Sequence, residues 1–65
     1  MLRLLTQREA AALLRLSERT LERLRVIGSG PVYVKAGRSV RYRLGDIEAW
    51  IAARVVSSTS EEARR

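Results

Sequence analysis

The stretch TQREAAALLRLSERTLERLR, residues 6–25, decides the fold because it contains two helix starts separated by a short break. Thr6 and Glu9 have the spacing of a capping box, in which each side chain accepts a hydrogen bond from the backbone N–H of the other residue. The alanines at residues 10–12 have high helix propensity, and their small side chains leave room for another helix to approach closely. We therefore expect a first helix over residues 7–14.

A second helix is expected immediately after the break. Ser17 is a residue type favoured at the N-cap, and the sequence ERTLERLR follows it. Leu21 and Leu24 fall on one side of this helix. Arg19 and Arg23 fall together on the other side because they are four residues apart. Two short helices joined by about three residues form a helix-turn-helix candidate.

Two segments with period-two alternation follow the loop sequence Gly-Ser-Gly-Pro at residues 28–31. In residues 32–35 two valines alternate with a tyrosine and a lysine, and in residues 40–44 apolar residues alternate with two arginines. Gly37 lies in the short turn between the segments. The pattern predicts a two-stranded β-hairpin, with Tyr42 on its apolar side and packed in the core.

A last helix is expected from residues 45–48, where two acidic residues lie in the first turn and complement the helix dipole. Its apolar stripe places Trp50 in the core, and the helix is expected to end near residues 54–56. The predicted fold is therefore a small α+β domain over residues 1–56. Residues 57–65 have no apolar period and are expected to form a flexible C-terminal tail.

Composition excludes several classes of function. The chain has 65 residues, no His and no Cys, so disulfides, thiolate or imidazole metal sites, cysteine nucleophiles and histidine acid–base chemistry are absent. A chain of this length has little room for a deep pocket. We expect no catalytic residues, cofactor, metal or small-molecule ligand. Because no apolar run approaches the roughly 18 residues of a membrane span and the N-terminus does not resemble a signal peptide, we expect a cytoplasmic protein.

The positive charge of the chain is unevenly distributed. Residues 1–25, 26–44 and 45–65 carry net charges of +3, +4 and −1, which add to the +6 of the whole chain. The excess therefore lies on the helix-turn-helix and the hairpin, whereas the last helix and the tail are slightly acidic. A basic surface built from a short helix and a neighbouring hairpin is typical of a protein that binds duplex DNA.

Two patterned segments, LTxxEAAxLLxLSxxTL at residues 5–21 and GPxxxKxGRxVRYxxxDIExWI at residues 30–51, cover most of the domain. Their order and spacing resemble the excisionase family, which includes recombination directionality factors and small AlpA-like regulators and is related to the MerR N-terminal domain. The resemblance implies a winged helix-turn-helix, with the second helix in the major groove and the hairpin wing on the DNA backbone or minor groove. Arg15 stands where the family often has glycine, which costs of order 1 kcal/mol if the turn requires positive φ.

Within that geometry, eight residues are expected to contact DNA. The recognition-helix residues are Ser17, Arg19, Thr20 and Arg23. The wing residues are Lys35, Arg38, Ser39 and Arg41. An arginine is suited to bind guanine N7 and O6 together, and a hairpin tip fits a minor groove about 6 Å wide.

Each of these assignments has a structural alternative. Ser17 is also a good N-cap, Arg19 and Arg23 have acidic neighbours with which to pair, and the wing tip serves equally as a solubilising turn. Glu22 either accepts a hydrogen bond from cytosine N4 or faces solvent, and Arg43 has Asp46 and Glu48 within pairing range.

The favoured hypothesis is a non-enzymatic excisionase that binds repeated sites on double-stranded DNA near an attachment site and bends or organises the DNA. Its partners would be an integrase or recombinase and further copies of itself, bound cooperatively. The main alternative is a small transcriptional regulator of a phage or mobile-element promoter. RNA binding is less well supported because aromatic residues are few, and no helix shows the exposed aromatic and basic faces of a membrane-surface helix.

Overall fold

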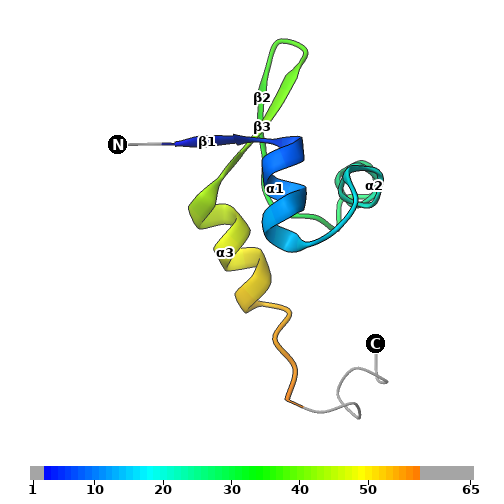
Figure 1. The fold of residues 1–65 in the computed structure, drawn as a ribbon, viewed down its shortest axis with the longest axis vertical. Helices are drawn as coiled ribbons and strands as arrows, with labels where there is room; N and C mark the ends of the chain where they lie inside the picture. Colours follow the sequence, from blue (N-terminus) through cyan, green and yellow to red (C-terminus); the bar gives the residue numbers. More distant parts are fainter. Residues whose placement is uncertain (1–2, 58–65) are drawn as a thin grey trace.

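The computed structural model describes residues 3–57, which form three helices and a three-stranded sheet. The elements are β1 (Leu4–Thr6), α1 (Gln7–Leu14), α2 (Glu18–Val26), β2 (Val34–Ala36), β3 (Ser39–Arg43) and α3 (Leu44–Ala52). Figure 1 shows the β2–β3 hairpin projecting away from the helices, with α2 and α3 on opposite sides of α1. The small α+β winged helix-turn-helix architecture expected from the sequence is confirmed.

The first helix begins at the expected capping box. The backbone N–H of Thr6 donates to Glu9 Oε1 at 2.9 Å, and the N–H of Glu9 donates to Thr6 Oγ1 at 3.1 Å. The hydrogen bond from the Thr6 backbone favours the charged carboxylate and so lowers the pKa of Glu9. The predicted bounds of this helix are confirmed, because local polar contacts at its first turn determine where it starts.

The turn between α1 and α2 depends on Arg15, which adopts a left-handed conformation with φ of 58°. Its N–H donates to the carbonyl of Ala12 at 3.1 Å, and the N–H of Leu16 donates to that of Ala11 at 2.9 Å. This pairing satisfies the last carbonyls of α1 in the manner of a Schellman motif. The turn does place its residue at positive φ, which was the condition for a cost at this position. Arg15, which has a Cβ, therefore bears that cost.

The sheet contains a strand that the sequence analysis did not predict. β1 pairs antiparallel with β3, so the strand order is β1-β3-β2 rather than a two-stranded hairpin. Leu5, which lies opposite Tyr42, is buried at 5% exposure. Three residues are too few to show an alternating pattern, and pairing with β3 rather than local propensity holds this segment extended.

The pairing of β2 with β3 also determines which residues share a face. Val34 lies opposite Arg41 and Lys35 lies opposite Val40. Directly opposed residues point to the same side of a sheet, so Lys35 lies on the core side with Val40, and Val34 lies on the other side. Tyr33, just before β2, packs with its ring centroid 6.3 Å from that of Tyr42. Tyr33, which is 41% exposed, therefore lies beside Tyr42, whereas Val34 is half-buried on the other side of the hairpin.

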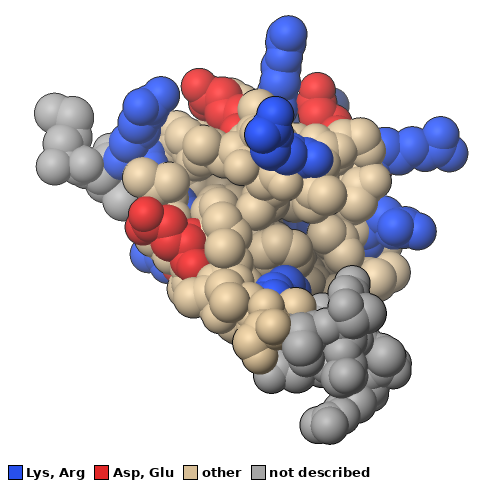
Figure 2. Space-filling view, turned by 60° about the horizontal axis from the view of Figure 1, so that its bottom comes forward, with Lys and Arg blue, Asp and Glu red and all other residues tan. Residues whose placement is uncertain are grey.

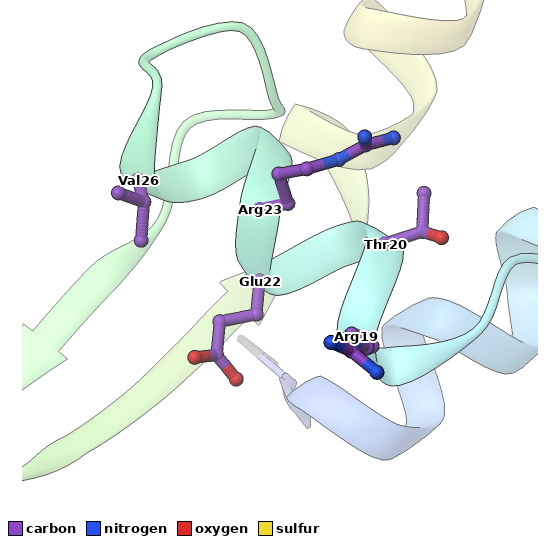
Figure 3. Close-up of a pocket in the computed structure, with 5 residues that line it drawn as sticks. All are labelled: Arg19, Thr20, Glu22, Arg23 and Val26. Carbon is purple, nitrogen blue, oxygen red and sulfur yellow. The ribbon is translucent and has the colours of Figure 1, made fainter.

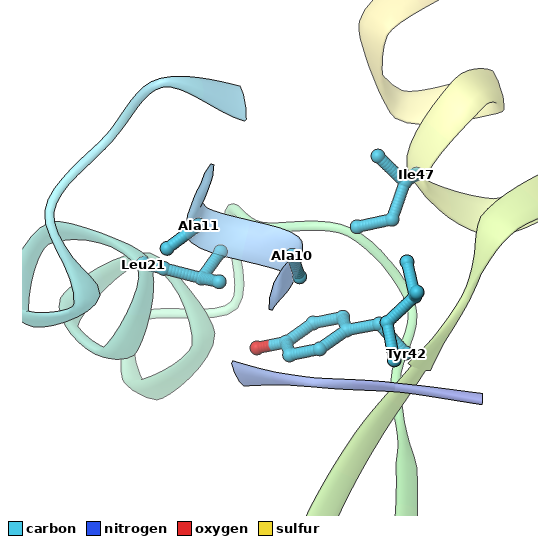
Figure 4. Packing of buried hydrophobic residues seen from close by; sticks show 6 residues of the cluster. Ala10, Ala11, Leu21, Tyr42 and Ile47 are labelled. Carbon is cyan, nitrogen blue, oxygen red and sulfur yellow. The ribbon is translucent and has the colours of Figure 1, made fainter. Parts of the chain in front are cut away.

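The core is small and lies where α1, α2, α3 and the sheet meet (Figure 4). Its buried members are Leu5, Ala10, Ala11, Leu21, Tyr42 and Ile47. The two alanines are at most 2% exposed and bring α1 close to α2, as their small side chains led us to expect. Burying Leu21 completely contributes on the order of 1.5–3 kcal/mol, which is a large share for a domain of this size.

The last helix differs from expectation at both ends and in one packing residue. It starts at Leu44, one residue before the predicted start, and ends at Ala52, before the end predicted near residues 54–56. Trp50 is not a core residue but is half-buried at the edge, because its indole N–H donates to the carbonyl of Ser29 at 2.9 Å. The flexible tail predicted for residues 57–65 lies, apart from Ser57, outside the residues that the structure describes.

Candidate nucleic-acid interface

The outer face of α2 forms a shallow hollow, which we call the α2 hollow (Figure 3). It is lined by Arg19, Thr20, Glu22, Arg23 and Val26. All of these except the half-buried Thr20 are exposed to solvent. In Figure 3 the side chains of Glu22 and Thr20 point to opposite sides of the helix, so the hollow presents different chemistry along its two borders.

Ser17 and Thr20, both predicted to contact DNA, are hydrogen-bonded to each other at the start of α2. Ser17 Oγ accepts from the Thr20 N–H at 3.0 Å and donates to Thr20 Oγ1 at 2.9 Å. The hydroxyl of Ser17 is therefore engaged as the N-cap of the helix, which was the structural alternative. The proton of the Thr20 hydroxyl remains available to a phosphate or a base edge.

The wing ends in a two-residue loop, Gly37 and Arg38, between the paired residues Ala36 and Ser39. Gly37 has φ of 61°, which glycine supplies at the first position of a tight hairpin turn without steric cost. Arg38 therefore lies at the very tip of the projecting hairpin, where its side chain is exposed.

The other predicted wing contacts do not share a face. By the register of the hairpin, Lys35 lies on the core side of the sheet, whereas Ser39 and Arg41 lie on the opposite side. Arg41 is half-buried, and its guanidinium donates to the carbonyl of Val40 at 2.8 Å. A DNA groove or phosphate backbone that contacts the wing would therefore meet Lys35 on one side of the hairpin and Arg41 on the other.

Besides Arg41, and Arg3 with its ion pair to Glu9 at 3.9 Å, three further arginines are engaged in structural contacts within the domain. Arg25 donates to the side chain of Gln7 and lies 5.8 Å from the ring centroid of Tyr33. Arg43 binds Asp46 through two hydrogen bonds of 2.6 and 3.1 Å, so the predicted pairing with Asp46 is confirmed. This carboxylate raises the pKa of Arg43. Arg54, the third, lies over Trp50.

Four of the predicted DNA-contacting cations are free of such contacts. Within residues 3–57, the side chains of Arg19, Arg23, Lys35 and Arg38 form no hydrogen bond or ion pair with another residue of the chain. The alternative in which Arg19 and Arg23 pair with neighbouring glutamates is not observed. Figure 2 shows basic side chains projecting into solvent around the outline of one face of the molecule. The four cations without an internal partner can neutralise phosphates without first breaking an ion pair within the protein.

Sequence reasoning missed one member of the α2 hollow. Val26 was not considered as a functional residue, although it follows Arg19 by seven residues and so lies on the same face of the helix. Glu22 was considered only as an alternative. Helical spacing was the signal that could have identified Val26.

A helix-turn-helix with a hairpin wing and a supporting third helix defines a winged helix-turn-helix domain, a class that binds duplex DNA. The sequence profile of a family described as a helix-turn-helix domain matches residues 4–55. The chain belongs to this family and is a DNA-binding helix-turn-helix domain. No curated protein matches the chain significantly. In the described part of the chain, no helix has the length and apolar character needed to cross a bilayer.

Proposed function

We propose that this protein is an excisionase, a recombination directionality factor that binds double-stranded DNA in a sequence-specific manner. In this role, α2 enters the major groove and the wing tip at Arg38 contacts the backbone or the minor groove. The observation that carries the proposal is the α2 hollow, where Arg19 and Arg23 are exposed and have no internal partner within residues 3–57. The protein acts by holding and bending DNA and catalyses no reaction itself.

Several copies act together in this proposal. One domain whose α2 spans nine residues covers only a few base pairs, so useful affinity requires cooperative binding of copies to adjacent repeats. These repeats lie beside an attachment site, and the assembled complex helps a separate integrase or recombinase to carry out excision. The proposed location is the bacterial cytoplasm, on the nucleoid.

The experiment that tests the proposal is a gel shift and footprint on the DNA that flanks the gene, including any neighbouring integrase gene and attachment site. Stepwise, cooperative protection of repeats at the attachment site is the expected result. Contact with about four to six phosphates predicts that log affinity falls with log salt at a slope of about −4 to −5.

Two other outcomes would change the proposal. Protection of one promoter alone would identify a transcriptional regulator of a phage or mobile element instead. A salt slope near zero, or no preference for duplex DNA at moderate salt, would contradict the proposed placement of α2 and the wing on DNA.

A further inference from the structure

We infer that the α2 hollow reads a thymine, through apolar contact between Val26 and the 5-methyl group of the base in the major groove. The inference rests on the proposed placement of α2 in that groove. It names a base preference and a residue that determines it, neither of which follows from DNA binding as such.

The first support is the position of Val26 in the fold. Val26 is 74% exposed, so it contributes little to the core. Valine also has a lower helix propensity than alanine or leucine, which makes it an unfavourable choice for an exposed position in the last turn of a helix. Neither packing nor helix formation accounts for a valine here.

The second support is the place of Val26 on the helix face. At about 100° per residue, seven residues bring Val26 to within about 20° of Arg19 around the helix axis. Glu22 and Arg23 lie on either side of this line, and Val26, the last residue of α2, borders the hollow at the C-terminal end of the helix. A ligand that extends along the face from Arg19 past Arg23 therefore also meets the isopropyl group of Val26.

The third support is the mixed chemistry of the α2 hollow. A surface that contacts only phosphates uses hydrogen-bond donors and cations, and the carboxylate of Glu22 would repel such a ligand. Base edges in the major groove present acceptors, amino donors and the thymine methyl group together. In the hollow, the arginines can donate hydrogen bonds to the acceptors, and Glu22 can accept from the amino groups. Val26 can contact the thymine methyl group.

The dimensions place the thymine relative to the base read by Arg19. Seven residues of α-helix advance about 10 Å along the axis. That length corresponds to about three base-pair steps of about 3.4 Å each. The thymine contacted by Val26 should therefore lie about three base pairs from the base contacted by Arg19.

The test uses the full chain and duplexes that it selects from a random pool, with each thymine of the selected site replaced in turn by uracil. Uracil differs from thymine only by lacking the 5-methyl group, so pairing is kept. The expected result is one position at which uracil weakens binding about four-fold, the value of one buried methyl group. In Val26→Ala, uracil and thymine at that position should bind equally.

The matched control is Val32→Ala. Val32 is 65% exposed but lies outside the α2 hollow, so its variant should keep the full preference for thymine over uracil. Val26→Ala raises helix propensity, so unfolding would not explain its loss of preference. Circular dichroism should show that both variants are folded.

The outcomes separate this inference from the proposed function. If the wild-type chain binds its selected duplex but accepts uracil at every position, the assignment of Val26 is overturned and DNA binding by α2 stands. The same holds if Val26→Ala and Val32→Ala lose the preference equally. If the wild-type chain selects no duplex at all, the proposed function and this inference both fail.

Discussion

The indole N–H of Trp50 donates a 2.9 Å hydrogen bond to the backbone carbonyl of Ser29, and so joins α3 to the loop between α2 and β2. The same carbonyl accepts from the guanidinium of Arg54 at 3.1 Å, and this guanidinium lies 4.1 Å from the centroid of the Trp50 ring. Because this loop connects α2 to the wing, α3 helps to set the position of α2 relative to the wing. The last helix therefore helps to shape the proposed DNA interface, although residues 45–65 carry none of the excess positive charge.

Replacing Trp50 with phenylalanine should lower the free energy of unfolding by about 1 kcal/mol, because one hydrogen bond to a backbone carbonyl is lost while most of the ring remains. Urea unfolding followed by far-ultraviolet circular dichroism measures this, since Trp50 is the only tryptophan and its fluorescence disappears in the variant. Affinity for DNA should also fall under conditions where the variant is fully folded.

The control for this variant is Glu48→Gln, an exposed change on the same helix that should alter stability by less than about 0.5 kcal/mol. A Trp50→Phe variant as stable as the control would show that the contact with Ser29 does not support the loop. Reduced stability with unchanged affinity would show that the loop does not set the position of the wing.

The features that the sequence predicted best are those determined by contacts close together in the chain. The capping box of Thr6 and Glu9 and the N-cap of Ser17 each depend on neighbours within a few residues. These contacts fix the bounds of α1 and the start of α2, and so the orientation of the face that carries Arg19.

The features that the sequence did not predict depend on distant pairing. The strand β1 exists because Leu5 pairs with Tyr42, and the face to which Lys35 belongs depends on register, which a shift of one residue would reverse. Trp50 was assigned to the core from its apolar spacing, but its polar N–H is satisfied at the edge by Ser29. The partners in these contacts are far apart in the sequence, so the periodicity of apolar residues could not predict them.

Arg15→Gly should stabilise the protein by about 0.5–1 kcal/mol. The residue has φ of 58°, a conformation that costs a residue with a Cβ about 1–2 kcal/mol and costs glycine almost nothing. Part of this gain is offset because glycine increases the conformational entropy of the unfolded chain. Urea unfolding of the wild-type and variant chains measures the difference.

Arg15→Ala is the matched control, because it removes the same charge but keeps the strain. It should show no gain in stability. If both variants are equally stable, the left-handed turn does not limit stability. If both bind DNA less tightly by the same factor, Arg15 contributes a phosphate contact through its charge.

Tyr42→Phe should leave stability unchanged or raise it slightly. The Tyr42 side chain is fully buried, and its hydroxyl has no hydrogen-bond partner among the residues that the structure describes. Removing a buried hydroxyl that lacks a partner removes a desolvation cost of about 1–3 kcal/mol while keeping the packed ring. Thermal unfolding of the variant measures the result, and a clear loss of stability would reveal a buried partner for the hydroxyl, such as an ordered water.

Arg19→Ala and Lys35→Ala should differ in how they affect DNA binding. Arg19 lies in the α2 hollow, where it faces base edges in the proposed complex, so its loss should reduce discrimination between selected and unrelated duplexes by about 1–3 kcal/mol. Lys35 lies on the wing, so its loss should weaken binding to all duplexes alike and make the salt slope shallower by about one. Titrations of both variants on both duplexes over a range of salt concentrations measure each quantity.

Both side chains are exposed and have no internal partner within residues 3–57, so neither change should disturb folding. If the two variants show the same loss of discrimination and the same slope, the division between a helix that reads the sequence and a wing that holds the backbone is wrong.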